Sequence, residues 1–68
     1  MNKINKPASE LTIEELQEEY LFQYERTTGR KTTLHYKHGW FVLDNRSPYR
    51  ADELRRMTVT LRERPTKA

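Results

Sequence analysis

The stretch KTTLHYKHGWFVLD, residues 31–44, decides the fold class. Its two halves are rich in β-branched and aromatic residues, which favour β-strands, and we expect strands over residues 31–37 and 40–44. His38 and Gly39 lie between these halves and have the composition of a tight turn. The stretch therefore predicts a two-stranded antiparallel hairpin.

The length of the turn determines which side chains share a face of this hairpin. A two-residue loop places four apolar or aromatic side chains on one face: Leu34, Tyr36, Phe41 and Leu43. The other face then carries His35, Lys37, Trp40 and Val42. A three-residue loop shifts the register by one residue and moves Trp40 and Val42 to the face of Leu34. We favour the two-residue loop, because it pairs aromatic with aromatic and aliphatic with aliphatic residues.

A helix over residues 12–28 is expected before the hairpin. Thr12 and Glu15 have the spacing of a capping box, and Gly29 can supply the left-handed residue that ends a helix. Apolar side chains recur at helical spacing: Ile13, Leu16, Tyr20 and Tyr24. Carboxylates fall outside this stripe and predict a solvated face: Glu14, Glu15, Glu18, Glu19 and Glu25. An alternative interpretation makes residues 20–24 a strand, with Tyr20, Phe22 and Tyr24 on one face.

A second helix is expected over residues 49–63, because Ser47-Pro48 is typical of a cap and a proline start and Pro65 ends it. The predicted fold is α+β, in the order helix–β-hairpin–helix (αββα), with both helices packed on one face of a two-stranded antiparallel sheet. The expected core consists of Leu16, Tyr20, Tyr24, Leu34, Leu54, Met57 and Leu61. The expected organisation is a flexible N-terminal arm (1–8), one domain (9–64) and a short tail (65–68).

The composition excludes several classes of protein. The 68 residues are 34% apolar and 34% charged, so one thin core is expected, with a net stability of about 3–5 kcal/mol. There is no cysteine, and no apolar run approaches the length of a membrane span. The first residues are not followed by the apolar segment that a secretory signal requires. We therefore expect a cytoplasmic protein.

The sequence offers no constellation for catalysis or for metal binding. His35 and His38 are three residues apart at a strand end, where their side chains point to opposite faces, and no cysteine completes a zinc site. Ser9 and Ser47 are better explained as helix caps than as nucleophiles. The two glycines cannot form a phosphate-binding loop. We expect no enzymatic activity, no cofactor and no small-molecule substrate.

Binding to another protein is the leading functional hypothesis. Residues 40–43 are four apolar residues in a row, and a sheet covered on one face buries only alternate ones. The residues expected to contact a partner are Phe22, His35, Lys37, Trp40 and Val42. The predicted function is a small non-catalytic protein-interaction module that binds a protein partner or a second copy of itself.

Nucleic-acid binding, in an accessory or regulatory role, is the alternative. Residues 1–25 carry two basic and six acidic side chains, whereas residues 26–68 carry eleven basic and four acidic ones. A basic hairpin and an arginine-lined second helix could follow phosphates. The residues assigned to this alternative are Arg30, Lys31, Lys37, Arg46, Arg55, Arg56 and Arg62. Acidic residues interrupt this positive field at Asp52, Glu53 and Glu63, which favours a solvated face with intramolecular pairs.

Two partial resemblances accompany these patterns. The helix–hairpin–helix order, with a turn at Lys37-His38-Gly39, resembles the small phage head-to-tail joining proteins, whose hairpin also turns at a Lys-x-Gly. The segments TIEEL (12–16) and YRADEL (49–54), with the hairpin between them, are similar to winged-helix excisionases and related regulators. Those proteins need a recognition helix before the wing, and residues 17–29 contain no break that would create one. The resemblances imply a bacterial or phage-like character and assign no residue a role.

Overall fold

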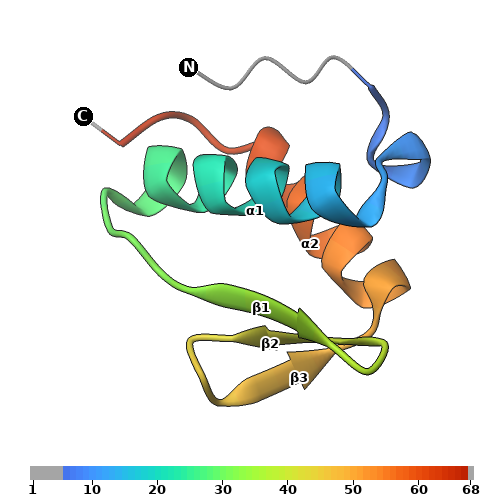
Figure 1. The fold of residues 1–68 in the computed structure, drawn as a ribbon. Coiled ribbons are helices and arrows are strands. Elements are labelled where there is room, and N and C mark those ends of the chain that lie inside the picture. The colour runs from blue at the N-terminus through green and yellow to red at the C-terminus, as the bar shows by residue number, and fades with distance from the viewer. Residues whose placement is uncertain (1–5, 68) are drawn as a thin grey trace.

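A computed structural model of the chain describes residues 6–67, and its ribbon is shown in Figure 1. A short 3₁₀ helix, η1 (Ala8–Glu10), comes first. The elements that follow are α1 (Ile13–Thr28), β1 (Leu34–Lys37), β2 (Trp40–Leu43), β3 (Ser47–Tyr49) and α2 (Ala51–Arg62). The predicted α+β class, with two helices and an antiparallel hairpin, is confirmed.

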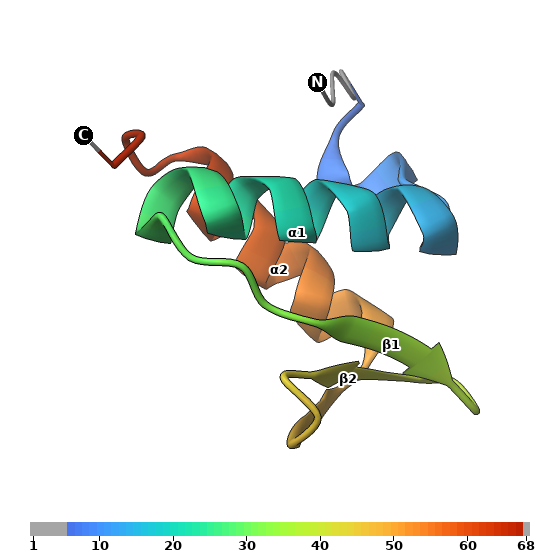
Figure 2. The same ribbon diagram turned by 60° about the vertical axis from the view of Figure 1, so that its left-hand side comes forward.

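Both helices lie on the same side of the sheet, and the two views in Figures 1 and 2 agree on this. The strand order is β1-β2-β3, so β2 is the central strand. The core lies between the helices and this face of the sheet, and its buried apolar residues are Ala8, Leu11, Leu16, Tyr20, Leu34, Phe41, Leu54 and Leu61. Tyr24 and Met57, also expected in the core, are half-buried and pack against it. No described segment lies over the opposite face of the sheet.

Helix α1 begins and ends where the local signals predict. Thr12 Oγ1 accepts a hydrogen bond from the Glu15 N–H at 3.1 Å, and Glu15 Oε1 accepts one from the Thr12 N–H at 3.0 Å. That backbone hydrogen bond, together with Lys6 at 3.0 Å from the carboxylate, holds the pKa of Glu15 below its ordinary value. Gly29 ends the helix with a left-handed φ of 74°. The alternative strand over residues 20–24 is therefore wrong.

The hairpin has the register of the two-residue loop. Leu34 pairs with Leu43 and Lys37 pairs with Trp40. The turn needs positive φ at both central residues, and His38 and Gly39 have φ values of 51° and 82°.

The prediction of a two-stranded sheet is wrong, because residues 47–49 form a third strand. Pro48 faces Val42 across the β2–β3 ladder, and a proline is tolerated there because β3 is an edge strand. Asp44 and Asn45 make the connecting turn in the left-handed region, with φ values of 55° and 57°. Helix α2 consequently begins at Ala51, two residues later than expected.

The N-terminal segment is packed against α2 where the structure describes it. Residues 1–5 of the predicted arm lie outside the described residues, but Ala8 and Leu11 are buried. Arg55 on α2 donates hydrogen bonds to Ala8 O at 2.6 Å and to Leu11 O at 2.7 Å. The guanidinium thus fixes both ends of η1 to α2.

Glu19 differs from the solvated carboxylate that the helical pattern predicts. Its residue surface is only 3% exposed, and its Oε2 accepts a hydrogen bond from Arg62 Nε at 2.6 Å. Gln23 Nε2 donates to the same oxygen at 3.1 Å. The pattern missed this pair because its two charges are separated by 43 residues of sequence.

Candidate interaction surface on the sheet

Alternation along the strands places one set of side chains on the face that the helices leave uncovered. We call this set the open face, and it consists of His35, Lys37, Trp40, Val42, Pro48 and Arg50. Phe41, between Trp40 and Val42, points to the opposite side and is completely buried. The open face therefore follows directly from the burial of Phe41 in the core.

The open face contains two rows that run across the strands. Lys37 of β1 lies beside Trp40 of β2, and Arg50 covers the indole from the side of β3, with Cζ 3.8 Å from the ring centroid. In the second row, His35 of β1 and Pro48 of β3 each pair with Val42 of β2. One row is therefore cationic and aromatic, and the other presents an apolar centre.

The side chain of Arg50 is held in place over the tryptophan. Its Nη1 donates to Gly39 O at 3.3 Å, and the contact with the indole is worth about 0.5–1 kcal/mol at an exposed site. The Arg50 N–H donates to Glu53 Oε1 at 3.3 Å, which fixes the start of α2. Trp40 still has 37% of its surface exposed.

The structure gathers four of the five predicted partner-binding residues. His35, Lys37, Trp40 and Val42 share the open face, but Phe22 is on α1. It lines a hollow of about 430 Å³ with residues of the C-terminal segment, such as Thr66 and Lys67. The sequence reasoning missed Pro48 and Arg50, because it assigned residues 47–48 to the start of a helix. An edge strand at Ser47–Tyr49, which the sequence analysis did not consider, places both on this face.

The basic residues of the nucleic-acid alternative do not form one continuous strip. Arg55 and Arg62 point inward and donate to carbonyl groups of residues 6–11. Arg46 is exposed and pairs with Asp44 at 3.2 Å. The remaining members are also exposed: Arg30, Lys31, Lys37 and Arg56. Two of the three arginines assigned from α2 are therefore used within the fold.

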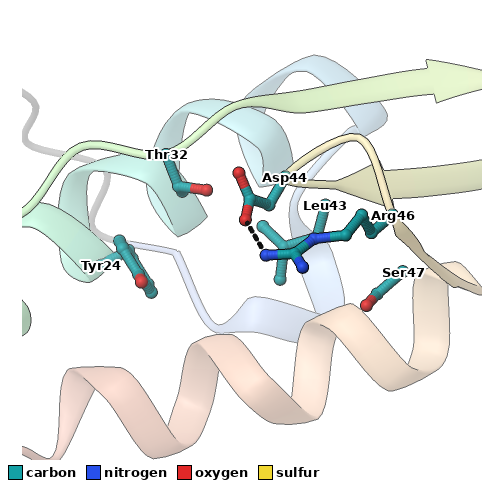
Figure 3. Close-up of a pocket in the computed structure, with 6 residues that line it drawn as sticks. All are labelled: Tyr24, Thr32, Leu43, Asp44, Arg46 and Ser47. Atoms are coloured by element: carbon teal, nitrogen blue, oxygen red, sulfur yellow. Dashed lines mark hydrogen bonds and ion pairs between the residues drawn. The ribbon is translucent and has the colours of Figure 1, made fainter.

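A separate shallow hollow of about 300 Å³ lies between the end of α1 and the β2–β3 turn. Figure 3 shows the side chains that line it, including Tyr24 from α1 and the Asp44–Arg46 ion pair from the turn. Both members of this pair are mostly exposed. Within residues 6–67, no group of three His, Cys, Asp or Glu side chains is placed to hold a metal ion.

The comparisons with known proteins add no family. No protein-family model matches the chain, and neither the curated proteins nor the solved structures provide a match. None of the helices in the described part of the chain is long and apolar enough to cross a membrane.

Proposed function

We propose that this protein is a small non-catalytic protein-interaction module that binds a protein partner through the open face. The observation that carries the proposal is Trp40, which lies on the central strand with 37% of its surface exposed. Both helices lie on the other side of the sheet (Figures 1 and 2). Tryptophan and arginine are both among the residue types most enriched at the positions that dominate binding energies at interfaces.

The shape of the open face supports the same function. It lies on β-strands rather than on loops, and Trp40 is fixed by Arg50 before a partner arrives. A surface that is already ordered loses little conformational entropy on binding. Val42 adds a half-buried apolar side chain next to Trp40.

The nucleic-acid alternative has less support from the contacts of the arginines. Affinity for nucleic acid depends on how many phosphates the protein neutralises. The hydrogen bonds of Arg55 and Arg62 to backbone carbonyls take both away from such a role.

Site-specific crosslinking tests the proposed function with a matched pair of positions. A benzophenone side chain placed at Val42 reports on the open face, whereas the same group at Val59 reports on the exposed side of α2, where the valine is 43% exposed. In cells that naturally contain this protein, we expect a discrete protein adduct from position 42 and none from position 59. The captured protein, once purified, should bind the parent chain at least about tenfold more tightly than it binds Val42→Thr.

Two results would contradict this proposal. One is equal adduct formation at both positions, and the other is equal binding of the captured protein to the parent and to Val42→Thr. Sedimentation at two concentrations separates self-association from binding to a different protein. An adduct between two copies of the chain, with a concentration-dependent mass, would assign the open face to self-association.

A further inference from the structure

We infer that the occupant of the open face is an acidic segment of another protein that also carries apolar side chains; this inference rests on the proposed function. It deepens that function by assigning a chemistry to the partner. The two rows of the open face and the side-chain cations that the fold leaves without an ion pair point to this chemistry.

Neither side-chain cation of the cationic row is paired with a carboxylate within the described chain; Glu53 Oε1 accepts from the Arg50 backbone N–H and not from its guanidinium. Lys6, Arg46 and Arg62 each have a carboxylate oxygen within 3.2 Å. Lys37 and Arg50 make no such ion pair with any residue of 6–67, and none of the six residues of the open face is acidic.

The two cations flank the tryptophan. Lys37 is opposite Trp40 on β1, and Arg50 reaches the indole from beyond β3. Arg50 uses Nη1 for Gly39 O, so other guanidinium nitrogens remain to bind a carboxylate in a planar, forked geometry. A segment lying across this row can pair its carboxylates with both cations while an apolar side chain contacts Val42 in the next row.

A second copy of this chain is a poorer occupant. Face-to-face self-association through the open face would enclose two copies of Lys37 and two of Arg50. It would bring no carboxylate from the same six residues to offset them. Like charges brought together in an interface disfavour that pairing.

A nucleic acid also fits less well. One side of the Trp40 ring is already covered by Arg50 at 3.8 Å, and that side is not available for stacking on a base. The second row offers Val42 and Pro48, which suit apolar side chains and cannot neutralise phosphates.

Titration of the full chain with defined probes, followed by amide resonances, tests this inference. The probes are a short tryptophan-free peptide of glutamate, leucine and glycine, the same peptide with every glutamate replaced by glutamine, and a short oligothymidylate. The acidic peptide should shift the amide resonances of Lys37, Trp40 and Arg50, and its affinity should fall as salt is added. The glutamine peptide should bind more weakly, and oligothymidylate more weakly than the acidic peptide.

Charge reversal at matched positions supplies the control. Lys37→Glu should weaken binding of the acidic peptide by about five- to tenfold. Lys31→Glu, at an exposed lysine before β1, should leave the affinity for this peptide unchanged. Equal effects of the two reversals would overturn the inference.

The outcomes also separate this inference from the proposed function. Equal affinity for the acidic and glutamine peptides would overturn the acidic partner, while crosslinking from Val42 would still decide the proposed function. Tighter binding of oligothymidylate than of the acidic peptide would overturn the inference of an acidic partner in favour of nucleic acid. Failure of the acidic peptide to bind at all would also overturn it, independently of the adducts formed at positions 42 and 59.

Discussion

Replacing Arg62 by methionine tests how α1 is held against α2. Glu19 on α1 is 3% exposed, and its carboxylate oxygen is 2.6 Å from Arg62 Nε. Arg62→Met removes the counter-charge, together with the hydrogen bond from Arg62 Nη1 to Lys6 O, and keeps an apolar side chain in place of the aliphatic part of the arginine. The carboxylate then retains the hydrogen bond from Gln23 but has lost its cation.

The expected loss follows from the burial of the two partners. Removing one member of a buried ion pair costs about 3–5 kcal/mol. The Arg62 side chain is 24% exposed, so water weakens the pair, and we expect a loss of about 2–3 kcal/mol. With a total stability of about 3–5 kcal/mol, the variant should lose most of its stability. Its Tm should fall by about 10–20 °C.

Urea and thermal unfolding, followed by circular dichroism, measure this loss. Arg64→Met is the matched control, because Arg64 is exposed near the same helix end and its replacement should change stability by less than about 0.5 kcal/mol. The double variant Glu19→Met/Arg62→Met removes both charges and should recover much of the loss. A stability of Arg62→Met within about 0.5 kcal/mol of the parent, or a double variant less stable than Arg62→Met, would refute the reasoning.

Arg55→Met should destabilise the protein by about 2 kcal/mol, because two carbonyls lose a charged donor, whereas Arg56→Met, at an exposed neighbour, should cost less than about 0.5 kcal/mol in the same unfolding assay. His38→Asn should stabilise the hairpin by about 0.5 kcal/mol, since asparagine adopts positive φ more readily in this turn; a lower urea midpoint would contradict this. Burial raises the pKa of Tyr20 from 10.0 to about 12, so stability should be lost as the pH rises from about 10 to 12, because the unfolded chain releases this proton first. Unfolding measured against pH should show no such component in Tyr20→Phe.

Local signals explain which elements could be predicted from the sequence. The bounds of α1 depend on Thr12, Glu15 and Gly29, which lie within a few residues of the backbone groups that they satisfy. The hairpin register depends on a two-residue turn and on the pairs beside it. In both cases the deciding interactions are close in sequence, so the pattern alone contains them.

The elements that the sequence reasoning missed depend on distant partners. Ser47-Pro48 is compatible with a helix cap and with an edge strand, and only pairing with β2 decides between them. Ala8 and Leu11 are isolated apolar residues in a polar segment, and they become core residues because α2 lies beside them and Arg55 holds their carbonyls. The candidate site divides in the same way. Its β1 and β2 residues follow from the local pairing of the hairpin, whereas the position of Arg50 depends on the third strand.

The basic side chains of this chain have two different roles, and net charge alone does not distinguish them. Arg26, Arg55 and Arg62 reach across the fold and donate to backbone carbonyls of segments more than thirty residues away. In a chain with only 34% apolar residues, such charged hydrogen bonds add stability of about 1.5–3 kcal/mol each where the core is thin. The side-chain cations of Lys37 and Arg50 make no ion pair with a carboxylate within residues 6–67, and they flank the exposed Trp40. Arginines that hold the fold together therefore do not count toward the positive charge available to a partner, and two of the cations that remain, Lys37 and Arg50, lie where the sheet is uncovered.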